Sequence, residues 1–155
     1  MESVKQQHDN FAEFKSRLFT HHRAQLDLCR RLESVADDLP NNFNPQECLS
    51  ISWQLFSTVK AAHKFEEEEL FPMLDTVTGF PLEMKKTVER LRYEHWEDEM
   101  SAEDISFYLK QLVRKPEDVN IGKTSYMLRG FFDGMRRHTA FEAEYLLPYL
   151  EFGLR

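Results

Sequence analysis

The sequence predicts an all-α protein, an antiparallel up-down-up-down four-helix bundle. The chain of 155 residues holds five glycines and six prolines, which indicates long elements and few turns. No segment shows the alternation of apolar and polar residues that is typical of a β-strand. Instead, four segments of roughly 25–30 residues carry apolar side chains at helical spacing, and because short loops join them, neighbouring helices should run in opposite directions.

The first two predicted helices are separated by turn residues. The first begins at about Asn10, and residues 39–45 end it with proline and asparagine turn chemistry. Asn44 suits the cap of the second helix, with Pro45 at its first position. Pro72 falls in the last turns of this helix and should bend or end it. Residues 1–8 are expected to form a loose lead-in.

The third and fourth helices follow the same pattern. Residues 76–81, which include glycine and proline, are the expected connection to a third helix that begins at about Leu82 and ends before the next loop, residues 114–122. A break of that helix at Met100 is an open alternative. The fourth helix is predicted from about Lys123 to Leu150, with Tyr145 and Tyr149 at the end of its inner face.

Length and charge limit the class of protein. A chain of this length suits one domain over residues 1–155, with a core over about 11–150. The net charge of −7 argues against nucleic acid or an anionic membrane as a partner. No apolar run reaches the ~18 residues of a membrane span, and the N-terminus lacks the apolar core of a signal peptide. The expectation is a cytoplasmic protein without disulfide bonds.

Two histidine–glutamate pairs stand out near the ends of the second and fourth helices. His63 and Glu67 are separated by three residues, as are His138 and Glu142, and after each pair come a short acidic spacer, two apolar residues and a proline. Residues four apart lie on one face of a helix, so the imidazole and the carboxylate can meet at one point. The repetition favours two halves of a metal site over two surface hydrogen bonds.

The other two helices also carry histidine on their apolar faces. A neutral imidazole is costly to bury without a partner, and His95 lies near the middle of the third helix at a compatible height. In the first helix, His21 and His22 are ~100° apart and cannot both point straight inward. His22 is preferred because it shares its side with Leu18 and Cys29, which leaves His21 as the alternative or as a hydrogen-bonding neighbour of the site.

These residue types predict a transition metal. Imidazole and carboxylate ligands without thiolate suit iron, manganese or zinc, whereas structural zinc sites have four ligands that usually include cysteine. Two octahedral ions offer about twelve coordination positions. Bridging carboxylates, histidines and a bridging oxygen nearly fill these positions. The count favours two metal ions with one position open to a ligand. The six convergent candidates are His22, His63, His95, His138, Glu67 and Glu142.

With these motifs in this order, the sequence resembles the hemerythrin-like family, the HHE cation-binding domains, over roughly residues 11–150. The resemblance implies a four-helix bundle that holds a non-haem di-iron centre. It implies that Glu67 and Glu142 bridge the two iron ions and that the histidines are terminal ligands. Members of the family bind oxygen, sense oxygen or iron, or act in nitrosative and oxidative stress. Zinc or manganese is the less favoured metal.

One position departs from the family's pattern. Oxygen-carrying members have a second histidine one turn after that of the third helix, where this chain has Glu99. Glu99 is therefore a candidate seventh ligand or a solvated side chain, and a further carboxylate disfavours reversible oxygen carriage. The expected activity is to bind, sense or react with oxygen, nitric oxide or peroxide. The alternative is a metal-responsive regulatory module that acts through a protein partner, and the pattern assigns no catalytic residue.

Two further features have a structural and a functional interpretation. Glu66, Glu68 and Glu69 form a charge run that is expected to be mostly a solvated face. Gly134, one turn before His138, indicates either close helix packing or space for a small ligand beside the metals.

Overall fold

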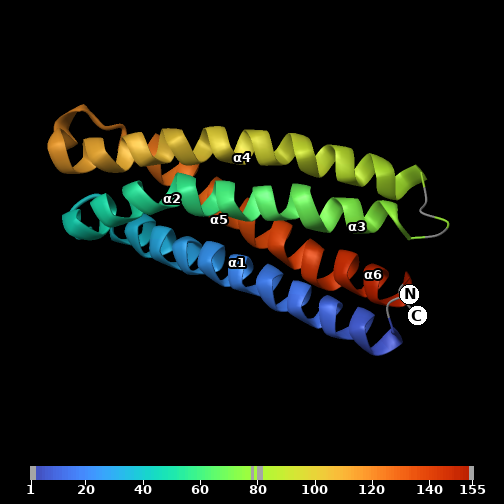
Figure 1. Cartoon of the computed structure of the whole chain (residues 1–155). Helices are drawn as coiled ribbons and strands as arrows, with labels where there is room; N and C mark the ends of the chain where they lie inside the picture. Colours follow the sequence, from blue (N-terminus) through green and yellow to red (C-terminus); the bar gives the residue numbers. More distant parts are fainter. Residues whose placement is uncertain (1–2, 78, 80–81, 154–155) are drawn as a thin grey trace.

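The computed structural model describes residues 3–77, 79 and 82–153, and all elements in this part of the chain are helical. The predicted all-α class is confirmed. The long helices and the short ones that continue them form four segments. Figure 1 shows these segments side by side, and the colour order shows that the chain reverses direction at each connection. The elements are α1 (Val4–Asp38), α2 (Pro45–Phe65), η1 (Glu66–Leu70), α3 (Phe71–Asp75), α4 (Leu82–Arg114), η2 (Pro116–Asp118), α5 (Ile121–Phe141), η3 (Glu142–Leu146) and α6 (Leu147–Gly153).

Polar side chains cap the helices at their starts. The Asn44 side chain accepts hydrogen bonds from the backbone N–H groups of Gln46 and Glu47, as predicted for the start of α2. Asn120 caps α5 in the same way. Such caps satisfy backbone donors that have no partner within the helix.

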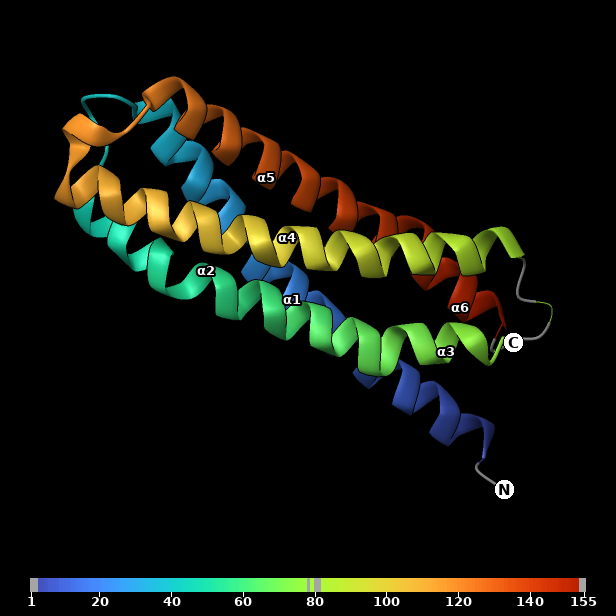
Figure 2. The same ribbon diagram turned by 90° about the horizontal axis from the view of Figure 1, so that it is seen from above.

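Helix α1 begins earlier than predicted. Ser3 caps it, so residues 4–8 are helical and not a loose lead-in, while residues 1–2 lie outside the described part. The first turns of α1 project beyond the other helices (Figure 2), and residues 4–10 are all exposed. The break considered at Met100 is absent, because α4 is continuous. The predicted connection over residues 76–81 lies partly outside the described residues.

Helices α2 and α5 each continue into a short π-helix. The N–H of Phe71 bonds to the carbonyl of Glu66, and that of Leu147 bonds to Glu142, each five residues back. A proline follows at once, Pro72 or Pro148. Proline lacks an N–H, and its ring clashes with the carbonyl four residues earlier in an α-helix. The wider π turn accommodates that clash, so the helix continues past Pro72 to Asp75 where the sequence suggested a bend or an end.

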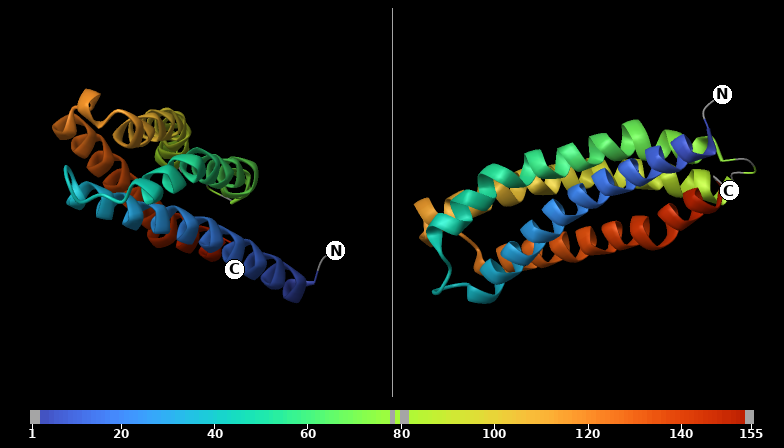
Figure 3. Two further views of the ribbon diagram at one scale, coloured as in Figure 1. Left: turned by 90° about the vertical axis from the view of Figure 1, so that its left-hand side faces the viewer. Right: turned by 60° about the horizontal axis from the view of Figure 1, so that its bottom comes forward.

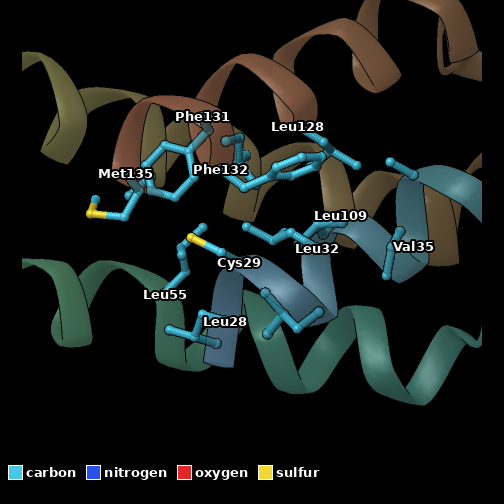
Figure 4. Packing of buried hydrophobic residues seen from close by; sticks show 14 of the residues in the cluster. Leu28, Cys29, Leu32, Val35, Leu55, Leu109, Leu128, Phe131, Phe132 and Met135 are labelled. Carbon is cyan, nitrogen blue, oxygen red and sulfur yellow. The ribbon is translucent and has the colours of Figure 1, made fainter. Parts of the chain in front are cut away.

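The apolar core has two parts along the bundle. Helix α2 packs mainly on α4, and α1 mainly on α5, as the two views of Figure 3 show. One cluster fills the end near the α1–α2 and α4–α5 connections, with Phe132, Leu32 and Leu109 among its fully buried members (Figure 4). The second cluster fills the other end, around Phe14 and Phe71. Along each long helical segment, a histidine lies between the two clusters.

The π-helix changes which side chains face inward. Tyr145, predicted on the inner face, is 62% exposed, whereas Leu146 is fully buried. The hydrogen bond of the π-helix spans five residues where that of an α-helix spans four, so its turn holds more than 3.6 residues and a constant helical period gives the wrong face after Glu142. Among the described residues, no helix is long and apolar enough to cross a membrane.

Candidate metal centre

Four histidines, one from each long helical segment, meet between the two apolar clusters. His22 of α1, His63 of α2, His95 of α4 and His138 of α5 are each at most 5% exposed. The rings of His63 and His95 stack, with centroids 3.9 Å apart and planes 7° from parallel. The His138 ring lies 5.2 Å from that of His95 and 6.0 Å from that of His63. Phe71 stacks on His95 at 5.5 Å, so an apolar ring covers this part of the cluster.

Two carboxylates, both fully buried, lie among these rings. Glu66 Oε2 is 2.7 Å from His95 Nε2 and 3.3 Å from His138 Nε2. Glu142 Oε1 is 2.9 Å from His22 Nε2 and 3.4 Å from His138 Nε2. Each carboxylate is the first residue of a π-helix, so the wide turns begin where the acidic side chains enter the site. π-bulges of this kind occur frequently at functional sites.

The structure corrects the expected position of the carboxylate from the second helix. Glu66, expected in a solvated charge run, is 0% exposed at the centre of the cluster. The side chain of Glu67, expected there, is 38% exposed and lies outside, with Oε1 3.0 Å from His95 Nδ1. Glu68 is exposed, as expected.

The reason is a difference of one residue between the two repeats. Counted forward from histidine, Glu67 and Glu142 correspond, but counted back from the prolines, Glu66 and Glu142 correspond, each six residues earlier. The structure follows the second alignment, because the π turns are set against Pro72 and Pro148. The proline spacing was the signal in the sequence that could have identified Glu66.

The remaining candidates lie at the edge of the site. His22 is buried against Glu142, whereas His21 is partly exposed and packs beside Phe65 at 5.0 Å, so His22 is the histidine of α1 that joins the cluster. The Glu99 side chain is 27% exposed, with Oε1 3.9 Å from His63 Nδ1. It is close to the cluster without a hydrogen bond to His63 in this arrangement.

The electrostatics of the site favour a cation. Burial alone would raise the pKa of Glu66, but contacts with His138 and His95 hold this pKa well below its usual value. Burial lowers the pKa of His138, yet Glu142 and Glu66 outweigh burial and raise it well above the usual value. A proton on His138 therefore supplies the positive charge between two buried carboxylates. Burial, and next the neighbouring His95, lower the pKa of His63 to about 3, which keeps that ring neutral and available as a ligand.

The site also contains polar atoms that have no hydrogen-bond partner. Among the described residues, eight buried side-chain atoms lack one, and six of these belong to the cluster: His63 Nδ1, His63 Nε2, Glu66 Oε1, His95 Nε2, His138 Nδ1 and Glu142 Oε2. His95 Nε2 is among them because its 2.7 Å contact with Glu66 Oε2 does not have the geometry of a hydrogen bond. Buried polar groups are costly unless they are paired or bind a metal. Two sets of side chains bring ligand atoms within 4.8 Å of one another: His63, Glu66 and His95 form one, and His22, Glu66 and Glu142 form the other. Donor type and unpartnered atoms therefore both fit a metal site, and Glu66 belongs to both sets.

A cavity leads from the surface between α4 and α5 to this cluster. It has a volume of about 510 Å³, and His138 and Gly134 are part of its wall. A Cβ on Gly134 would meet only the end of the Arg137 side chain, at 3.8 Å, so close helix packing does not explain this glycine. Asp98 also lines the cavity, and burial raises its pKa to about 6, although His138 and His95 act in the opposite direction.

The comparison with protein families agrees with this geometry. The family model described as Hemerythrin HHE cation binding domain matches residues 13–150. The chain belongs to the hemerythrin HHE cation-binding family. The predicted resemblance is thereby confirmed, and with it the assignment to a domain that binds metal cations. No curated protein and no solved structure matched this hemerythrin-like chain.

Proposed function

We propose that this hemerythrin-like chain is a non-haem di-iron protein that binds, senses or reacts with a small ligand such as oxygen, nitric oxide or peroxide. The observation that carries the proposal is the membership of Glu66 in two sets of three convergent ligands. A carboxylate has two oxygens and can bind two cations at once, so one residue shared by two sets suits a bridge. Imidazole and carboxylate donors without thiolate suit iron.

The proposed ligands follow from the two sets. His63 and His95 would hold one ion with Glu66, and His22 and Glu142 would hold the other. His138 Nε2, within 3.4 Å of an oxygen of each buried carboxylate, is the further histidine of the site. Glu142 is the second bridging candidate, because His22 and His138 contact it from two sides. Glu99 is left as a candidate at the edge.

Glu67 has a different role in this proposal from the bridge that the sequence suggested. When His95 Nδ1–H donates its hydrogen bond to Glu67 Oε1, the unprotonated Nε2 faces Glu66. Carboxylates that fix the tautomer and orientation of a ligand histidine in this way are common next to metal sites. Glu67 would therefore orient His95 from the partly exposed side.

Two iron ions held by these residues would supply an exchangeable position and two-electron redox chemistry for a small ligand. The protein provides the surroundings. The cavity beside Gly134 offers a route to His138, and Phe71 excludes water from one face of His95. The two buried carboxylates balance the charge of the cations, and the antiparallel order of the helices lets each long segment contribute one histidine.

The experiment is metal analysis combined with ligand titration. Protein purified without added metal is expected to contain about two iron ions per chain and to change its absorption spectrum when oxygen, nitric oxide or peroxide is added. Full iron loading without any spectral response to these three ligands would refute the reactive function. Zinc or manganese in place of iron would refute the di-iron centre.

A metal-responsive regulatory module is the second candidate. It is favoured by the origin of the four histidines, one from each long helical segment, because a metal bound there links all four segments. Metal that binds only the folded state stabilises it, so occupancy would change the stability that a partner protein can sense. A melting temperature that is the same with and without metal would exclude this function.

A further inference from the structure

The outer face of α4 carries a row of exposed apolar side chains. Tyr93, Trp96, Met100 and Phe107 are 58%, 55%, 48% and 55% exposed, and we call them the α4 stripe. At 100° per residue they fall within about 60° of one another around the helix, and over 14 residues they extend about 21 Å along it. The rings of Tyr93 and Trp96 lie 5.9 Å apart. The inner side of the same helix supplies His95, so this row is no part of the core.

Acidic side chains surround the stripe. Residues 93–109 contain six carboxylates and no lysine or arginine. Glu97, Glu103 and Asp104 are exposed on or beside the stripe. Within the described part of the chain, none of these three carboxylates forms an ion pair. Glu94, closer to the N-terminus of α4, pairs with Arg90.

We propose that the α4 stripe is a docking surface for a basic amphipathic helix of a partner protein. Half-exposed aromatic and methionine side chains offer roughly 100 Å² each, about 400 Å² together, compared with about 800 Å² per partner in a standard interface. This area suits one helix. Apolar residues at i, i+3, i+4 and i+7 of the partner match such a row, and lysine or arginine beside them complements Glu97, Glu103 and Asp104.

The charges disfavour two other occupants. A second copy of the chain would place the same carboxylates opposite one another, and an anionic membrane would be repelled in the same way. The proposal does not rest on the metal centre, because the four side chains of the stripe are exposed and none belongs to the histidine cluster.

The test uses a synthetic helix of about 18 residues, roughly 27 Å long, with leucine at helical spacing and lysine on both flanks. Fluorescence anisotropy of the labelled peptide measures its Kd for the full chain. Trp96→Ala is expected to weaken binding about tenfold or more, as for an aromatic anchor residue. Trp53→Ala is the matched control, because Trp53 is 69% exposed on α2, and it should leave Kd unchanged.

Charge reversal tests the second part of the proposal. Glu103→Lys combined with Asp104→Lys should weaken binding of the lysine peptide and strengthen binding of a glutamate-flanked version. Both residues are exposed, so circular dichroism should show an unchanged fold. The proposal is overturned if the lysine peptide does not bind, if the glutamate peptide binds wild-type protein equally well, or if Trp53→Ala weakens binding as much as Trp96→Ala. Sedimentation that reveals a dimer dissociated by Trp96→Ala would assign the surface to a second copy instead.

Discussion

Replacement of Glu66 should remove the dinuclear centre, whereas replacement of Glu67 should not. Without Glu66, neither set of three ligands remains: one is reduced to His63 and His95, the other to His22 and Glu142. Bound iron in Glu66→Ala is therefore expected to fall from about two ions per chain to less than one. Glu67→Ala should retain both ions and bind them more weakly, because it loses only the hydrogen bond that orients His95; such losses cost about 10–100-fold in affinity.

The size of the effect on stability can be estimated. Free metal at a thousand times its Kd stabilises the folded state by about 4.1 kcal/mol per site. In a chain of 155 residues, each kcal/mol shifts the melting temperature by about 2–4 °C. Wild-type protein should therefore melt about 8–16 °C higher when one site is filled, and Glu66→Ala should lose most of this shift.

The assay is differential scanning fluorimetry of metal-free and iron-loaded protein, with iron content measured on the same samples. The shift is taken between two forms of one variant, so a change in the stability of the metal-free protein cancels. Glu68→Ala is the surface control, because Glu68 is exposed in the same π-helix. Two bound irons and an unchanged shift in Glu66→Ala would refute the bridging role, as would an equal loss in Glu67→Ala.

Three further predictions concern the cavity and the core. Gly134→Leu should narrow the cavity beside His138 and slow nitric oxide binding to the iron-loaded protein in stopped-flow measurements, while Gly130→Leu, an exposed position one turn earlier, should not; equal rates in both variants would exclude this route. Burial raises the pKa of the Cys29 thiol to about 12 from 9.0, so the unfolded state releases this proton first and stability should fall by up to about 1.4 kcal/mol per pH unit above pH 9. Urea unfolding of Cys29→Ala should show a shallower fall over this range, and an identical slope would contradict the assignment. Phe132→Ala should cost about 3–5 kcal/mol in the same assay, because its ring is fully buried in the first apolar cluster; a cost under about 1 kcal/mol would mean that the cluster is not packed as described.

The sequence was sufficient for the helices because their apolar spacing and their caps act locally. Asn44 and the periodicity of α4 are examples, and both depend on neighbours within a few residues. The four histidines were found for the same reason. A histidine on the apolar face of a helix is unusual, and the spacing of residues within that helix is enough to recognise it. These features are independent of how the helices pack.

The sequence was not sufficient for the carboxylate of the second helix. A count of His-x3-Glu assumes a constant helical period, and the π turns before Pro72 and Pro148 break this assumption. The same shift exposes Tyr145. In a run of four glutamates, composition does not distinguish the buried one, and only the tertiary contacts with His95 and His138 select Glu66.

The most direct test of the account is the amount and position of metal in the protein purified without added metal. Elemental analysis should give about two irons per chain, and anomalous diffraction at the iron edge should show two peaks about 3.5–4 Å apart, one on each side of the Glu66 carboxylate. A single peak, a metal other than iron, or two peaks with Glu67 in place of Glu66 between them would contradict the account.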